Sequence, residues 1–250
     1  MNESPAIASA NQSRFEAIST RSSLMEQAHH GSDSQMATAR GALVLRYRRA
    51  IRTYLGALLQ NDADADDVTQ SVLIKLLEGG FSGAAAERGR FRNYLKVAVR
   101  NAALTHLRKR PQAVEHELSD PAIDQDDWDH QWRQAILTSA WRSLREFEQG
   151  QPGNLGHTLL QLVTEYPAED SQQLAARVSS LIGREIRADA VRKQLSRARR
   201  KFAQLLLEEV KQTLDDPTPE RLEEELAEIG LLKHVRDFLP SESAAGSAIN

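Results

Sequence analysis

The sequence contains no cysteine. Disulfides and thiolate metal sites are therefore excluded, which fits the reducing cytosol. No stretch approaches the roughly 18 apolar residues that a membrane-spanning helix needs. The first residues also lack the basic patch and apolar run of a signal peptide. We therefore expect a cytoplasmic protein.

Catalytic patterns are missing as well. The seven histidines are scattered, with none of the spacings that build a zinc site on a helix. The glycine-rich stretch GGFSG at 79–83 lacks the Gly-Lys-Ser/Thr that completes a phosphate-binding loop. The clustered carboxylates have neither a nearby histidine nor an apolar setting that would suit acid–base chemistry. We predict no catalytic residue, no metal and no cofactor, and hence a protein that is not an enzyme.

Residues that favour strands are scarce, and aromatic residues make up only 5% of the chain. Ala, Leu, Glu, Arg and Gln dominate, and all of them favour helices. The composition predicts an all-α protein, and the length suggests one large or two small domains. The stretch PQAVEHELSDPAIDQDDWD, with two prolines and seven acids, indicates an acidic linker between two small helical domains. The expected divisions are a mostly disordered extension 1–35, a first domain 36–111, a linker 112–130, a second domain 131–213, and an acidic helix and tail 214–250.

Apolar spacing and helix breakers predict the helices themselves. In the first domain we expect helices at about 38–60, at 65–78 with Asp64 as its N-cap, and from Phe91 to just before Pro111. Further helices are expected at about 130–149, 155–165, 169–182, 188–213 and 218–237.

Charge is strongly segregated along a chain whose net charge is only -3. Residues 88–110 hold eight Lys or Arg and no acid, whereas residues 115–129 hold seven Asp or Glu and no Lys or Arg. The pattern repeats, because the basic stretch 184–201 precedes the acidic stretch 208–228. Two basic segments indicate two surfaces for a polyanion. The alternative is a pair of ordinary solvated helix faces, although such faces usually mix both signs.

The most informative local pattern lies near the C-terminus. A short apolar helix reaches Gly183, and a turn then leads into a long basic helix. This order is typical of a helix-turn-helix. Five side chains lie mostly off the buried stripe of the second helix, where they could meet phosphates and base edges: Arg192, Lys193, Ser196, Arg197 and Arg200. An ordinary helical hairpin is the alternative.

Three motifs, taken in order, resemble a bacterial RNA polymerase sigma factor of the extracytoplasmic-function (ECF) type. They are DADDVTQSVLIKLL at 64–77, FRNYLKVAVRNAALTHLRKR at 91–110 and VRKQLSRARRK at 191–201. The first two are similar to region two of that family, and the third to its region four. The lead-in before residue 56 and the tail after residue 207 are similar to extensions of planctomycete-type members.

The resemblance implies a protein that binds core RNA polymerase, directs it to promoters and helps to open the duplex. In the family, the acidic helix of region two docks on the polymerase. The residues that would do so here are Asp66, Asp67, Gln70, Leu73, Ile74 and Leu77. The alternative role for Asp66 and Asp67 is to stabilise a helix N-terminus.

Promoter DNA is the second implied partner. The loop Gly79 to Arg90, with Phe81 as a candidate pocket wall, and the following helix would contact the minus-ten element. The five exposed residues of the second basic helix would contact the minus-thirty-five element. In region two the DNA-binding set is Arg88, Arg90, Arg92, Lys96, Arg100, Asn101, Arg108, Lys109 and Arg110.

Two departures from the family pattern stand out. The turn GREIRAD is longer than usual and offers no Ser or Thr N-cap for the following helix, and Tyr94 stands where many members have Trp. An anti-sigma factor or another regulator is a further candidate partner. From charge alone, the acidic C-terminal helix is a candidate shield for the basic helix 188–213.

Two other classes of protein remain open at this point. One is a conventional helix-turn-helix regulator that binds duplex DNA without replacing a sigma factor. The other is an enzyme acting on nucleic acid, which would need a carboxylate or histidine constellation that the sequence does not display.

Overall fold

The computed structural model describes residues 32–78, 91–109, 121–214 and 217–239, and all regular structure in these residues is helical. The predicted all-α fold is confirmed. The elements are α3 (Asp33–Leu59), α4 (Asp62–Leu77), α5 (Phe91–Arg108), α6 (Pro121–Gln149), α7 (Gly156–Glu165), α8 (Ser171–Ile182), α9 (Ala188–Lys211), α10 (Pro219–Glu228), α11 (Leu232–Val235) and the 3₁₀ turn η1 (Arg236–Phe238).

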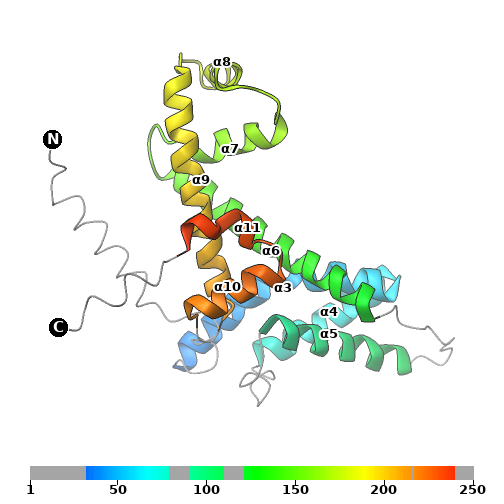
Figure 1. The fold of residues 1–250 in the computed structure, drawn as a ribbon. Helices are drawn as coiled ribbons and strands as arrows, with labels where there is room; N and C mark the ends of the chain where they lie inside the picture. The colour runs from blue at the N-terminus through cyan, green and yellow to red at the C-terminus, as the bar shows by residue number, and fades with distance from the viewer. Residues whose placement is uncertain (1–31, 79–90, 110–120, 215–216, 240–250) are drawn as a thin grey trace, which may run out of the picture.

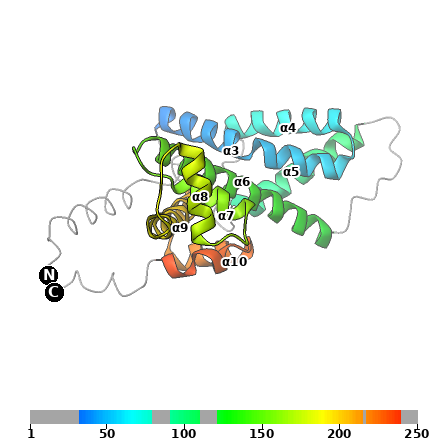
Figure 2. The same cartoon turned by 90° about the horizontal axis from the view of Figure 1, so that it is seen from above.

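Helices α6 and α9 connect the two ends of the molecule (Figure 1). Helices α7 and α8 pack against the first half of α9, whereas α10 and α11 lie beside its second half. Helices α3, α4 and α5 form a separate group that packs along the first half of α6 (Figure 2). The basic helix α9 is therefore held at one end by a small helical unit and at the other by the C-terminal segment.

Local capping sets the limits of the first two helices. Ser32 and Gln35 form a capping box at the start of α3, and Gln60 ends it in the left-handed conformation. The N-cap of α4 is Asn61, whose side chain accepts a hydrogen bond from the Asp64 backbone N–H at 3.0 Å. The expectation that Asp64 is the N-cap is therefore wrong. Asp64 lies inside the first turn, is buried, and contacts His106 of α5 at 3.0 Å.

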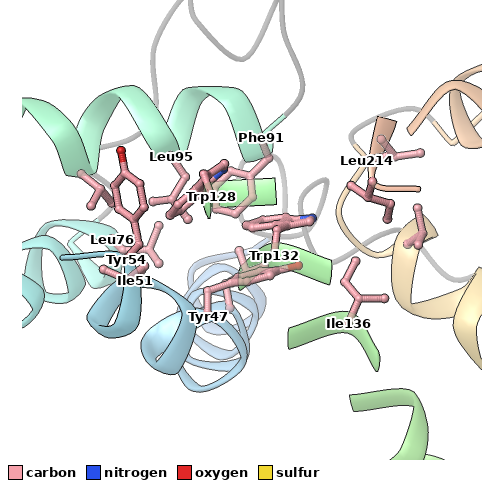
Figure 3. Packing of buried hydrophobic residues seen from close by; sticks show 14 of the residues in the cluster. Tyr47, Ile51, Tyr54, Leu76, Phe91, Leu95, Trp128, Trp132, Ile136 and Leu214 are labelled. Carbon is pink, nitrogen blue, oxygen red and sulfur yellow. The ribbon is translucent and has the colours of Figure 1, made fainter. Parts of the chain in front are cut away.

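An aromatic cluster fills the space between α3, α5 and α6 (Figure 3). The rings of Tyr47 and Trp132 are stacked, with centroids 4.0 Å apart and planes 4° from parallel. Trp128 meets Tyr54 edge-on at 5.1 Å, and Phe91 lies 5.9 Å from Tyr47. Each such ring removes a large apolar area from water, so these few aromatic residues contribute much of the core.

Helix α6 begins nine residues earlier than the sequence indicated. Residues 121–130, expected in an acidic linker, are helical instead, and residues 112–120 lie outside the described residues. Pro121 stands at the first helical position, where its missing N–H leaves no bond unmade. The continuous helix carries Trp128 and Trp132 into the core of α3 and α5, and it then carries Leu144 into the core of the other helical unit.

Arg92 of α5 is 1% exposed and is surrounded by carboxylates from two other helices. Its Nε donates to Glu225 of α10 at 2.9 Å, and its two terminal nitrogens bond Asp129 of α6 and Glu228 of α10. Trp128 adds a hydrogen bond from its indole nitrogen to the Arg92 carbonyl oxygen at 3.1 Å. Burial alone would lower the pKa of Arg92, but the three carboxylates outweigh it and raise that pKa.

The C-terminal segment was expected to form one helix over 218–237, but it is broken in two. Gly230, with a φ of 70°, turns the chain in a left-handed conformation between α10 and α11. The break lets Leu226 and Ile229 on one side, and Leu231 and Val235 on the other, enter the same core. One buried cluster thus contains residues of α3, α4, α5, α6, α9, α10 and α11, and it crosses the expected domain boundaries.

We predict that Arg92→Met lowers the free energy of unfolding by about 3–5 kcal/mol, since it removes the buried guanidinium that bonds the carboxylates of Asp129, Glu225 and Glu228. Urea denaturation followed by circular dichroism measures the change. The matched control is Arg108→Met on the exposed end of the same helix, which should change stability by about 0.5 kcal/mol or less. Equal effects of the two substitutions would show that the buried cluster is not a structural requirement.

Candidate functional site

One face of α4 is exposed and combines acidic, polar and apolar side chains. Asp66, Asp67, Gln70, Ile74 and Leu77 recur at helical spacing on this face, and all five are exposed. Ile74 and Leu77 are each 46% exposed and are three residues apart, so they lie next to each other on this side of α4. We call these five residues the α4 face. Leu73, expected to belong with them, is 9% exposed and packs in the core instead.

The two carboxylates of the α4 face differ in their surroundings. Asp66 accepts a hydrogen bond from Nε of Arg52 at 3.0 Å, and the same guanidinium bonds Asp62 at 2.9 Å. These carboxylates raise the pKa of Arg52, first through the hydrogen bond to Asp66. Asp67 forms no ion pair within the described ranges. Asp67 can therefore meet a partner without first giving up an internal bond.

Helix α5 buries two of its predicted DNA contacts. Arg92 and Lys96 are 1% and 9% exposed, and they are buried together with Phe91 and Leu95. Arg92 is bonded to three carboxylates, so in this structure it cannot hold a phosphate. The buried face is turned toward the basic side of the helix because α6 and α10 supply the carboxylates there.

The remaining predicted DNA contacts of this region fall into two groups. Asn101 and Arg108 of α5 and Lys109 just after it are exposed, and Arg100 is half-buried, so these four side chains are accessible. The others, together with the candidate pocket wall Phe81, lie outside the described residues: Arg88, Arg90 and Arg110.

A short turn joins α8 to α9. Gly183 ends α8 in the left-handed conformation, with a φ of 68°. The Ile186 backbone N–H donates to Ser179 Oγ at 2.8 Å and so ties the turn back to α8. Arg187 is the N-cap of α9 but makes no side-chain cap, which agrees with the lack of Ser or Thr seen in the sequence. The turn is thus fixed from the α8 side.

The first half of α9 shows a clear division between its two sides. Val191, Leu195 and Ala198 are buried against α7 and α8. All five predicted DNA-contacting side chains of this helix are exposed, and we call them the α9 face: Arg192, Lys193, Ser196, Arg197 and Arg200. Arg192 donates to Ser171 Oγ at the start of α8 at 3.0 Å, so its side chain is partly positioned already.

Polar contacts that the sequence did not reveal hold the start of α7 against α9 and against α6. Gln194 accepts a hydrogen bond from the Leu155 backbone N–H at 3.1 Å. Glu148 of α6 accepts from the backbone N–H and hydroxyl of Thr158, at 2.9 and 2.7 Å, and so caps the start of α7. No sequence pattern marks these residues, because each contact joins separate helices.

The acidic helix α10 does not cover the α9 face. Its Leu222 and Leu226 enter the core beside Leu206 and Val210, in the second half of α9. Glu225 and Glu228 face Arg92 of α5. The hypothesis that this helix shields the basic half of α9 is therefore wrong for this structure.

The described residues offer neither a metal site nor a membrane span. No group of three or more His, Cys, Asp or Glu in those residues could hold a metal ion. No helix among them is long and apolar enough to cross a membrane.

Comparison with known proteins identifies the first helical group. Residues 43–112 match the family model of sigma-70 region 2, a segment that spans less than a third of the 250-residue chain. It contains α4, α5 and most of α3. Over this segment the chain is similar to region 2 of the sigma-70 factors. No curated protein and no solved structure matches the chain.

His157 provides a test of the packing behind the α9 face. It is buried in α7, lies edge-on to Trp141 at 5.6 Å, and accepts a hydrogen bond from Arg145 Nε at 3.4 Å. Burial, followed by the charge of Arg145, lowers its pKa below the ordinary 6.5. The unfolded chain therefore takes up this proton first, so stability should fall as the pH drops through 6.5.

We predict that His157→Gln flattens the dependence of unfolding free energy on pH between about 7.5 and 5.5. Urea denaturation at a series of pH values gives the slope. His130→Gln, at an exposed position of α6, is the matched control and should keep the slope of the unchanged protein. An unchanged slope in His157→Gln would contradict the prediction.

Proposed function

We propose that the protein is an ECF-type sigma factor that binds core RNA polymerase through the α4 face and promoter DNA through α5 and α9. The observation that carries the proposal is the sigma-70 region 2 match over 43–112, combined with an exposed α4 face inside that segment. The similarity of the extensions to those of planctomycete-type members belongs to the same proposal.

The α4 face suits a protein partner. Acidic and polar residues lie beside the exposed side chains of Ile74 and Leu77, an arrangement that combines charge steering with apolar burial. Within the described residues, no other helix covers these two side chains. The basic partner surface expected from the family resemblance would complement Asp67.

Promoter contacts would divide between the two basic helices. In the minus-ten element, the exposed Asn101, Arg108 and Lys109 of α5 are the proposed contacts, together with the predicted residues of 79–90 and 110. In the minus-thirty-five element, α8, its turn and α9 would act as a helix-turn-helix, with the α9 face in the major groove. The division of α9 into a buried apolar side and an exposed basic side supports this role.

Reconstitution with core RNA polymerase, followed by sequencing of the 5′ ends of the transcripts, tests the proposal. We expect co-purification with the core enzyme and transcripts that start downstream of a shared pair of promoter elements. A conventional helix-turn-helix regulator would instead bind its duplex site without polymerase and would not co-purify with it. That result would overturn the proposal.

The α4 face yields a sharper prediction. Ile74→Asp combined with Leu77→Asp should weaken binding to core polymerase by about tenfold or more, because a charge replaces apolar contact at the centre of the surface. Fluorescence anisotropy of labelled protein titrated with core enzyme measures the affinity. Lys75→Asp, an exposed position between them on another side of α4, is the matched control. Equal affinities of both variants would discredit this surface.

The α9 face yields a second prediction, which concerns DNA binding. Arg197→Ala with Arg200→Ala should weaken holoenzyme binding to its promoter by about tenfold or more. The double substitution should also lower the slope of log affinity against log salt by roughly 0.9 for each phosphate that the variant no longer neutralises. Arg48→Ala with Arg49→Ala removes the same charge from an exposed part of α3 and serves as the control. An unchanged salt slope in the α9 variant would contradict the proposed DNA contact.

A further inference from the structure

A pocket of about 530 Å³ lies apart from the α4 and α9 faces, between α6, α7, the middle of α9 and the C-terminal segment. Most of its wall is apolar. Leu137 and Trp141 of α6, Phe202 and Leu206 of α9, and Phe238 of η1 all contribute. Its volume is within the range of about 300–1,000 Å³ that is usual for small-molecule sites.

The charge around this pocket has one sign only. Arg133 of α6, Arg199 of α9 and Lys233 of α11 all line it, and no Asp or Glu does. None of the three cations forms an ion pair with a carboxylate of the described residues. In a chain of net charge -3, three cations around one apolar hollow, with no ion-pair partner among the residues that the structure describes, form a local excess of positive charge.

The C-terminal segment gives the pocket a defined wall. Leu231 and Val235 are anchored in the core, so α11 is held in place beside α9. Gly230 turns the chain toward α6, where a Cβ atom would approach Nη1 of Arg133 to 2.9 Å. A larger residue at this position would have to displace the end of the Arg133 side chain, which lines the pocket.

We propose that this pocket binds an amphipathic organic anion, such as an alkyl or aryl carboxylate. The apolar part of such a ligand would be removed from water against the leucine and aromatic wall. Its anionic group would meet the guanidinium and ammonium groups of the lining, which are strong donors to carboxylates. The proposal concerns a site separate from the polymerase and promoter surfaces, so its failure would leave the proposed function standing.

Binding is measured on the full chain, without polymerase or DNA, by the fluorescence of 8-anilinonaphthalene-1-sulfonate (ANS). Decanoate serves as a competitor and decanol as its neutral counterpart. We expect saturable binding of ANS, displacement by decanoate, and displacement by decanol at least about fivefold weaker. Absence of binding, or equal displacement by decanoate and decanol, would overturn the proposal.

A pair of charge-matched variants locates the site. Arg199→Gln with Lys233→Gln should weaken decanoate binding by about tenfold, because two of the three cations of the lining are lost. Arg197→Gln with Arg200→Gln removes equal charge from the same region of α9 but outside the pocket, and should leave decanoate binding unchanged. Equal weakening in the two variants would mean a non-specific effect of net charge and would overturn the proposal.

A third variant fills the pocket. Val163→Trp replaces a small isopropyl group with an indole ring at a half-buried position of the lining. This variant should no longer show displacement of ANS by decanoate. Cooperative urea unfolding of each variant excludes ANS binding to a loosened state. A chain that ends at Leu239 tests another occupant: if only this shorter chain bound decanoate, residues 240–250 would be the occupant and the proposal would be wrong.

Discussion

The ion cluster around Arg92 joins three parts of the chain that are far apart in sequence. Its partners Asp129, Glu225 and Glu228 are 37, 133 and 136 residues away. A guanidinium this deeply buried loses its hydration. Only carboxylates held at hydrogen-bonding distance compensate for that loss. The placement of α6 and α10 relative to α5 is therefore coupled to one side chain. If that side chain were neutral, the carboxylates of Asp129, Glu225 and Glu228 would lose the guanidinium, and the C-terminal segment would be held by its apolar residues without this ion cluster.

Helix α6 extends this coupling to the second helical unit. Trp128 and Trp132 fix its first half in the aromatic core, and Leu144 fixes its second half among α7, α8 and α9. Arg46 of α3 also bonds Glu209 of α9 at 3.0 Å, with both side chains largely buried. The helix that carries the α9 face is thus tied to the sigma-70 region 2 segment through packing and through charge.

Sequence periodicity located most helices because their apolar residues repeat at helical spacing, as in α7, α8 and α9. Periodicity failed to predict burial where a partner from a distant part of the chain buries a charged side chain. The sequence predicted that Arg92 and Lys96 face solvent, because no neighbouring residue indicates the distant carboxylates that bond Arg92. The first turns of α6 were missed for a related reason, because an acidic stretch near two prolines is typical of a linker. The α4 face was predicted except for Leu73, whose burial depends on where α3 packs.

The alternation of basic and acidic segments therefore has two different causes. The first basic segment has a partner within the protein. The acidic stretches 115–129 and 208–228 supply the three carboxylates that bond Arg92. For the second, the basic residues of the α9 face remain exposed, and α10 lies beside the other half of this helix. Two carboxylates of α10 bond Arg92 of α5 instead. The exposed basic surface of α9 therefore supports the proposed polyanion contact more directly than the start of α5 does, because Arg92 there is buried and already paired.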